Sequence, residues 1–325
     1  MRGPTEELTI AVTTNHPTRR RSSARAGRAV AAVGVILILA IACAWIPGVV
    51  GTAAAAILPW LGLVLLVLVA LAVFVARRVL VVLLVPALLW VLAIAPSAPG
   101  FASSAAEGSS SITVVSQNVR AHSGGAADSA AELAASGADI VALTELDGDS
   151  LTAASETLAA EYPHSYAVGT VALWSRFPLT DAQPLTLGLD WKRALRVVVD
   201  TPDAEVAVYV MHAASVRPGQ QHDRDLMLSG IADAVATDAA ESVVVVGDFN
   251  AASADPALGP IRAQLDWVRP TDGTLGLTWP AALPLARIDQ VFVRGADVLG
   301  STTTRVGESD HLATVTTLAV RPAKP

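Results

Sequence analysis

The sequence predicts an α/β protein: a four-layer α/β/β/α sandwich of two packed mixed β-sheets flanked by helices, preceded by three transmembrane helices. A mean hydropathy of +0.52 over 325 residues is too apolar for a purely soluble chain. Residues 29–96 contain only two charged residues, Arg77 and Arg78, whereas charges recur every few positions from Glu107 onward. Short apolar runs after residue 110 alternate with helical patterns, which is typical of a layered α/β domain.

The N-terminal third divides into a tail and three apolar stretches. Residues 1–28 hold several arginines and no apolar periodicity, which predicts a disordered basic cytoplasmic tail. Each stretch that follows is near the roughly 20 residues that cross a hydrocarbon core. The predicted spans are about residues 29–46, 53–76 and 79–95.

The positions of the arginines predict the orientation. The positive-inside rule places the tail and the 77–78 turn in the cytoplasm, so three spans put residue 97 onward outside, as the extracytoplasmic part of a multi-pass cell-membrane protein. Two alternatives stay open. If the third stretch, which contains Pro86, does not cross, the C-terminal domain lies inside. If a signal peptide is cleaved near 42–44, two spans remain and the domain still faces outward.

Charge and cysteine content exclude some classes of site. After residue 97 there are 27 acidic and 14 basic residues, a net charge of −13. Such a field repels polyanions and argues against tight, sequence-independent binding of nucleic acid. Cys43 is the single cysteine, so neither an intrachain disulfide nor a cysteine-based metal site can form.

The C-terminal domain is predicted at residues 111–320, after a linker at 97–110 that is rich in Ser, Ala, Pro and Gly and before a tail at 321–325. The predicted strands are 112–116, 139–143, 167–173, 195–199, 206–211, 243–246, 288–293 and 313–319, and the predicted helices are 129–136, 151–160 and 223–236. Charges on the last helix, Arg224 among them, are interpreted as a solvated face.

Polar side chains follow several of these strands at the point where each strand ends. Strand ends are where a rigid scaffold presents chemistry. The residues concerned are Asn118, Glu145, His212, Asp248, Asn250 and His311. In one case a fully apolar run stops at Gly247 and then exposes a carboxylate and a carboxamide two positions apart.

These pieces occur in an order that resembles the endonuclease/exonuclease/phosphatase superfamily, over about residues 111–320. The matching segments are Gln117-Asn118, Thr144-Glu145, Leu173–Leu179, Met211-His212, Gly247–Asn250, Thr278–Pro280, Arg287–Val293 and Glu308–His311. The resemblance implies a metal-dependent phosphoric ester hydrolase. Gln290 departs from the family, because a histidine is common at that position, and this puts the substrate class in doubt.

Phosphodiester hydrolysis needs a cation, a base for water and donors for the developing charge, and the residues are assigned to these tasks. Hard oxygen ligands for Mg²⁺ or Mn²⁺ are expected from Asn118, Glu145 and Asp310. The expected catalytic residues are His212 as a phosphate contact, Asp248 for the attacking water, Asn250 on a phosphoryl oxygen, and His311 as acid or base with the family-matched Asp289 as its partner.

Non-functional interpretations are also open for three of these residues: Asn118 could cap a turn, Glu145 could be a solvated acid, and His212 could be a buried core histidine. The expected function is hydrolysis of a phosphate ester outside the cytoplasm. A small or lipid-linked substrate is favoured over a long nucleic acid, and no protein partner is evident from the sequence. The alternatives are an extracytoplasmic nuclease and an anchored binding module without catalysis.

Overall fold

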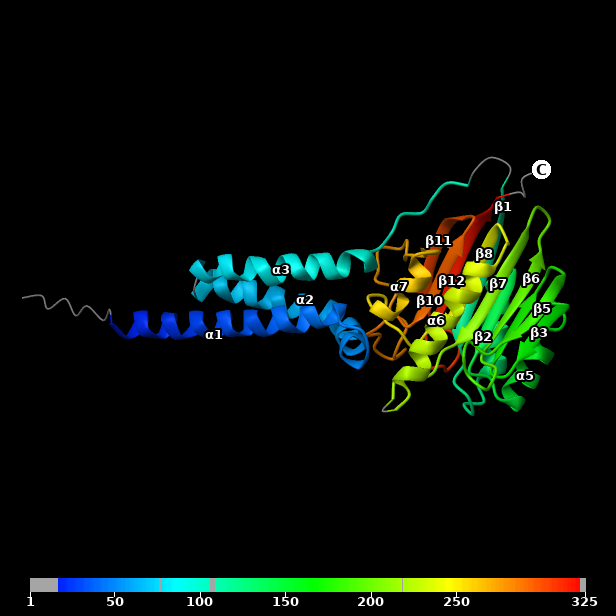
Figure 1. Ribbon diagram of the computed structural model, residues 1–325, viewed down its shortest axis with the longest axis horizontal. Helices are drawn as coiled ribbons and strands as arrows, with labels where there is room; N and C mark the ends of the chain where they lie inside the picture. Colours follow the sequence, from blue (N-terminus) through cyan, green and yellow to red (C-terminus); the bar gives the residue numbers. More distant parts are fainter. Residues whose placement is uncertain (1–16, 76, 106–108, 218, 322–325) are drawn as a thin grey trace, which may run out of the picture.

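The computed structural model describes residues 17–75, 77–105, 109–217 and 219–321. The part of the predicted tail at 1–16, and the chain end from 322, lie outside the described residues. Three long helices lie side by side and meet a domain of two packed sheets at one of their ends (Figure 1). Within the described residues, three helices are long and apolar enough to cross a membrane.

The helical part consists of α1 (Pro17–Ala42), α2 (Val49–Val75) and α3 (Leu80–Ile94), with 3₁₀ turns η1 (Cys43–Trp45), η2 (Arg77–Val79) and η3 (Ala95–Ser97). Buried Ile41, Leu58 and Leu83 form the seam between the three helices. Helix α1 begins at Pro17, twelve residues before the predicted span, so residues 17–28 are helical where the sequence predicts a disordered tail. Alanine and arginine both favour the helix, which explains why it continues past the apolar stretch.

One sheet has the strand order β11 (Ala296–Thr304), β12 (Ala313–Val320), β1 (Ser110–Asn118), β2 (Ile140–Thr144), β4 (Val171–Ser175), β3 (His164–Val168). The other has the order β5 (Leu179–Leu185), β6 (Ala194–Asp200), β7 (Glu205–His212), β8 (Ser242–Asp248), β10 (Asp289–Arg294), β9 (Asp266–Trp267). Both sheets mix parallel and antiparallel pairs, as β1 with β2 and β12 shows.

Helices cover the outer face of each sheet. Helices α4 (Ala126–Ala135) and α5 (Gly148–Leu158) pack on the first sheet, and α6 (Gln221–Thr237), η4 (Pro256–Leu258) and α7 (Gly259–Arg262) pack on the second. Between the sheets lies a dry layer of Val, Ile and Leu side chains, whose burial supplies most of the driving force for folding. The predicted α/β/β/α sandwich with three preceding helices is confirmed.

Three predictions about elements were wrong or incomplete. The apolar run predicted as one strand at 167–173 is a hairpin of β3 and β4, because the chain turns at Gly169 with φ +56. A Cβ there would lie 1.9 Å from the Lys192 carbonyl oxygen. The outer strands β5 and β11 were not predicted. Arg224, predicted to lie on a solvated face, is fully buried.

Candidate active site

Strand register places three predicted site residues next to one another at one edge of the second sheet. His212 pairs with Asp248 across the parallel β7–β8 ladder, and Asp248 pairs with Asp289 across the antiparallel β8–β10 ladder. Directly paired residues project from the same face of a sheet. All three side chains are nearly inaccessible to solvent.

The backbone at this edge is unusual. Gly247 has φ +130, and a Cβ there would lie 2.0 Å from the Met211 carbonyl oxygen, so only glycine lets β8 pass this close to β7. Glu145 (φ +61) and Asn250 (φ +47) both occupy the left-handed region, which non-glycine residues seldom adopt. Such conformations cluster at functional sites, where the surrounding structure must hold them.

The first sheet contributes Asn118 and Glu145 from the ends of β1 and β2. Asn118 stands opposite Thr144 in the parallel β1–β2 register, which brings Glu145 beside it. Asn118 Nδ2 donates to Glu145 Oε2 at 2.7 Å and to Asp248 Oδ2 at 3.0 Å. Asn118 therefore bridges carboxylates from both sheets and is more than the cap of a turn.

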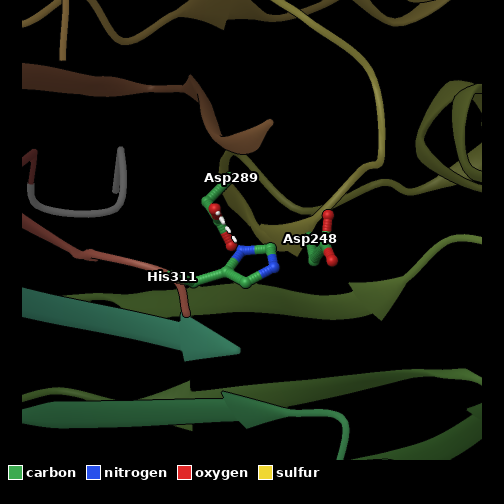
Figure 2. A group of neighbouring side chains, drawn as sticks. All are labelled: Asp248, Asp289 and His311. Carbon is green, nitrogen blue, oxygen red and sulfur yellow. Dashed lines mark hydrogen bonds and ion pairs between the residues drawn. The ribbon is translucent and has the colours of Figure 1, made fainter. Parts of the chain in front are cut away.

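His311 precedes β12 and closes the cluster. Its Nδ1 lies 2.9 Å from Asp289 Oδ2, and Figure 2 shows the ring between Asp289 and Asp248, with the second ring nitrogen on the Asp248 side. The loop is held by Ser309, whose hydroxyl donates to the Asn118 carbonyl at 2.5 Å and accepts from the His311 N–H at 3.0 Å. Ser309 is a supporting residue to which the sequence analysis gave no role.

The buried charges of the cluster shift the pKa values of His311 and Asp248. Burial opposes a cationic imidazole, but the charge of Asp289, the hydrogen bond to it and the charge of Asp248 prevail and raise the pKa of His311 to about 10. Burial, and then the charge of Asp289, raises the pKa of Asp248 to about 7. At neutral pH His311 is thus a cation that can give a proton, and Asp248 has a pKa suited to a general base.

His212 differs from His311 in charge. Burial, and then the positive charges of Arg193 and His311, hold the pKa of His212 well below its usual value, so the ring is neutral at pH 7. Nη2 of Arg193 lies 2.6 Å from Nδ1 and 2.7 Å from Nε2 of this ring. Arg193 was missed in the sequence, where a basic residue just before β6 resembles an ordinary solvated charge.

Asn250 lies just after β8 and is tied to its neighbours. Its backbone N–H donates to Asp248 Oδ1 at 2.8 Å, and its Nδ2 donates to the Ala213 carbonyl at 3.0 Å. Gln290, the departure from the family pattern, is buried and structural: its Nε2 donates to the Ala251 and Arg287 carbonyls at 2.8 and 2.7 Å. The glutamine therefore supports the loop behind the site without reaching its surface.

Two sets of residues could hold a divalent cation. Of the predicted ligands, Asn118 and Glu145 are joined by a hydrogen bond, and Asp310 belongs to the loop before β12, where its Oδ1 is buried with no hydrogen-bond partner among the described residues. A second set is Asp248, Asp289 and His311, whose ligand atoms lie within 4.8 Å of one another. The positive charge of His311 opposes a cation in the second set, so the chemistry of the donors favours the first.

The fold consists of two packed sheets whose adjoining edges gather carboxylates, carboxamides and imidazoles. The chain belongs to the Endonuclease/Exonuclease/phosphatase family, whose profile matches residues 115–311. Members of this family hydrolyse phosphoesters and are typically dependent on a divalent metal. A search of curated proteins gave no match to the sequence.

Solved structures share the fold at low sequence identity. Humanized TDP2 of D. rerio is 18% identical with a TM-score of 0.55, covering 65% of this chain and 99% of that one. Truncated TDP2 of Caenorhabditis elegans is 16% identical with a TM-score of 0.55, covering 65% and 98%. Beta toxin of Staphylococcus aureus is 16% identical with a TM-score of 0.50, covering 63% and 99%. These likenesses concern the fold alone.

Proposed function

We propose that the protein is a membrane-anchored, divalent-metal-dependent phosphodiesterase or phosphatase that acts outside the cytoplasm on a small or lipid-linked phosphate ester. The observation that carries the proposal is the meeting of the cationic His311 with two buried carboxylates, beside Asn118 and Glu145 from the other sheet. Such a cluster would bring an acid, a base and ligands for a cation close together.

Glu145, Asn118 and Asp310 would hold Mg²⁺ or Mn²⁺, because carboxylate and carboxamide oxygens suit both ions. The bound ion would offset the negative charge that repels a nucleophile from a phosphate ester. Asn118 also orients Glu145 through the 2.7 Å hydrogen bond between Nδ2 and Oε2. Loss of either residue would therefore weaken metal binding.

The remaining residues divide the proton transfers between them. Asp248 takes a proton from the attacking water while the oxygen of that water forms a bond to phosphorus. The ester P–O bond to the leaving group breaks, and the leaving oxygen takes a proton from His311. Asp289 stabilises the imidazolium through the 2.9 Å contact with Nδ1, which leaves Nε2 as the nitrogen that faces the substrate.

Three side chains would contact the phosphoryl oxygens. The neutral His212 can donate a hydrogen bond, and Arg193 adds a positive charge beside the imidazole. Asn250 Nδ2 can donate once the substrate displaces its 3.3 Å contact with Asp248 Oδ2. Arg193 is 8% exposed, and its Nε is buried with no hydrogen-bond partner among the described residues. A buried donor of this kind is satisfied by an anionic oxygen of a bound phosphate.

The orientation of the domain supports a substrate at the membrane surface. The indole Nε1 of Trp60, in α2, donates to the Leu285 carbonyl at 2.9 Å. Leu285 lies in the loop before the Asp289 strand, and the Ala281 N–H of this loop donates to the Asp310 carbonyl at 2.7 Å. Exposed Trp279 and Leu283 belong to the same loop. The edge that carries the site is therefore the edge next to the anchor.

The length of α2 supports a position for this loop near the membrane surface. Trp60 stands seventeen residues before Arg77, which is about 26 Å of helix at ~1.5 Å per residue. The hydrocarbon core is about 30 Å thick. With Arg77 at the cytoplasmic boundary, Trp60 lies near the outer boundary, where tryptophan is enriched. A phosphate ester of a lipid headgroup would lie at the same level.

A nuclease is the second candidate. TDP2 of D. rerio, solved with a single-stranded DNA product, is 19% identical with a TM-score of 0.55 and covers 65% of this chain. The net charge of −13 after residue 97 disfavours a long polyanion. Salt-sensitive cleavage of DNA, without turnover of lipid or sugar phosphates, would reverse this order.

The test is hydrolysis of bis-p-nitrophenyl phosphate and of a panel of phosphomonoesters by the full chain in detergent micelles, with Mg²⁺, Mn²⁺ or EDTA. His311→Ala should lose about 10² to 10⁴ of kcat, which is the usual contribution of an acid–base residue. The matched control is His164→Ala at the far end of β3, which pairs with Ser175 and lies away from the site.

Diester turnover that EDTA abolishes and His164→Ala keeps would support a phosphodiesterase. Monoester turnover alone would indicate a phosphatase. Absence of turnover on these compounds and on vesicles of phosphatidylcholine and phosphatidylglycerol would refute the proposal and favour an anchored binding module. Equal losses in both histidine variants would refute the role of His311.

A further inference from the structure

A buried arginine joins the anchor to the catalytic domain. Arg224, in the first turn of α6, has no solvent-exposed surface. A buried guanidinium must have its charge paired and its five N–H donors satisfied. Its partners therefore show which segments it holds together.

The guanidinium uses all five donors. Its Nε donates to Asp225 Oδ1 at 3.0 Å. Nη1 donates to Asp255 Oδ2 at 2.7 Å and to the Asn250 carbonyl at 3.1 Å. Nη2 donates to Asp225 Oδ1 at 2.5 Å and to Thr52 Oγ1 at 2.9 Å. Two of the partners are carboxylates, one belongs to the catalytic loop, and one belongs to α2.

Thr52 is an unusual residue for its helix. It is the only serine, threonine or charged residue of α2, and it is 5% exposed. Its hydroxyl accepts from Arg224 and also from Gln221 Nε2, at 3.2 Å. Thr52 stands eight residues before Trp60, which is about 12 Å of helix at ~1.5 Å per residue, so with Trp60 near the outer boundary it lies outside the hydrocarbon core and beside α6. The hydroxyl therefore serves the contact with α6.

The other side of the guanidinium holds the loop that follows β8. Asn250 adopts φ +47, and its N–H contacts the catalytic carboxylate of Asp248. Asp255 closes the loop, since its N–H donates to the Ala252 carbonyl at 2.8 Å and its Oδ1 accepts from the Ala257 N–H at 2.9 Å. Arg224 thus binds both ends of the Asn250–Asp255 segment, and Ala254 within it packs against the core of the anchor.

We propose that Thr52 and Arg224 are positioning residues for Asn250, and that the docked α2 helix is part of the scaffold of the active site. This inference rests on the proposed function, because it concerns the placement of a phosphoryl contact. Nη2 of Arg224 is held by the Thr52 hydroxyl, and Nη1 of the same guanidinium holds the Asn250 carbonyl. An anchor that moves away from α6 leaves this donor unpaired and loosens the catalytic loop.

The test compares Thr52→Val and Thr52→Ser in the full chain, in detergent micelles with Mg²⁺ and bis-p-nitrophenyl phosphate. Valine keeps the shape of threonine without the hydroxyl, and serine keeps the hydroxyl. We expect Thr52→Val to lower kcat about tenfold or more, with little change in KM, because a buried hydrogen bond to a charged group is lost. Thr52→Ser should restore kcat.

The matched control is Thr157→Val in α5. Thr157 is exposed, and its hydroxyl donates only within its own helix, to the Ala153 carbonyl at 2.8 Å. This variant should keep wild-type kcat and KM.

A second readout does not depend on activity. Hydrogen exchange of residues 249–255 should become faster in Thr52→Val and return to the wild-type rate in Thr52→Ser, while exchange in β8 stays unchanged. Wild-type kcat and wild-type exchange in Thr52→Val would overturn the proposal. So would faster exchange throughout the domain together with a lower Tm, since that result indicates general destabilisation. If the wild-type chain hydrolyses no phosphate ester, the proposed function fails, and the exchange of residues 249–255 still decides whether Thr52 holds the loop.

Discussion

Two aspartates with little-exposed side chains differ in pKa: Asp248 ends strand β8, and Asp238 is the C-cap of helix α6, four residues before that strand begins. Asp248, at the end of the strand, has a pKa raised to about 7 by burial and by Asp289. Asp238, which precedes the strand, has a pKa of about 2, because hydrogen bonds from Arg196 and Tyr209 outweigh the effect of burial. The pKa of Asp248 thus lies close to neutral pH, whereas Asp238 is ionised at neutral pH.

The difference lies in the partners. Arg196 Nε and Nη2 donate to the two oxygens of Asp238 at 2.7 and 3.1 Å, and the Tyr209 hydroxyl adds a third contact at 2.5 Å. Asp248 has carboxamide partners and a neighbouring acid, and no arginine of the described residues forms an ion pair with it. A hollow of about 930 Å³ lies beside Asp238, and in its lining Arg196 is paired with both Asp238 and Asp181. We therefore expect the paired Asp238 to contribute to stability, and we propose that the acid cluster at Asp248 contributes to catalysis.

The largest expected effect is on catalysis at the first aspartate. Asp248→Asn should lower kcat for the diester by about 10² to 10⁴, because the base for water is lost. Its Tm should stay the same or rise, because burying the charged carboxylate beside Asp289 is unfavourable. Steady-state kinetics and thermal unfolding of the full chain in micelles check both parts. A large fall in Tm with a proportional loss of active enzyme would contradict the comparison.

The next effect is on stability at the second aspartate. Asp238→Asn should cost about 2 kcal/mol of unfolding free energy at neutral pH, from a pKa lowered from 3.8 to about 2. The loss should shrink as the pH falls from about 4 toward 2, where the native carboxylate also becomes protonated. Denaturant unfolding of the wild type and the variant at several pH values measures this. A loss that is independent of pH would show that the ion pair is not its source.

The smallest effect is expected for Tyr209→Phe, which removes the hydroxyl contact with Asp238 Oδ2 and leaves the ring in the core. The cost should be about 1 kcal/mol, the usual net value of a buried hydrogen bond. Unfolding of Tyr209→Phe, Asp238→Asn and the double variant forms a cycle in which the tyrosine effect should shrink once Asp238 is neutral. Strict additivity would show that the two side chains do not act together.

Much of the fold could be predicted because the signals are local. Apolar runs with abrupt ends predict β1, β7, β8 and β12, and the breaks at Gly137 and Gly247 locate turns. The hairpin at Gly169 was missed because apolar residues continue on both sides of it. Strand β11 was missed because it is an outer strand with mixed burial and a register shift near Gly300.

The site could be predicted only in part, because only some of its residues carry a signal in the local sequence. Residues after strand ends are visible in the sequence, so Asn118, Asp248 and His311 were found. Arg193 and Arg224 depend on tertiary partners, and an arginine with buried partners has the same local sequence signal as a solvated one. The sequence likewise carries no signal that the hydroxyl of Thr52 in an apolar helix has a buried partner about 170 positions away.

The most direct test is one comparison of kcat: bis-p-nitrophenyl phosphate hydrolysis by the wild type, Asp248→Asn and Asp238→Asn, at pH 7 with Mg²⁺ and again with EDTA. Asp238, the C-cap of α6, lies outside the site cluster, and its carboxylate is bound by Arg196 and Tyr209. We predict that EDTA abolishes turnover, that Asp248→Asn loses at least about a hundredfold, and that Asp238→Asn stays near the wild type. Turnover that persists in EDTA, or equal losses in the two variants, would contradict the assignment of the β8 carboxyl end as a metal-dependent hydrolytic site.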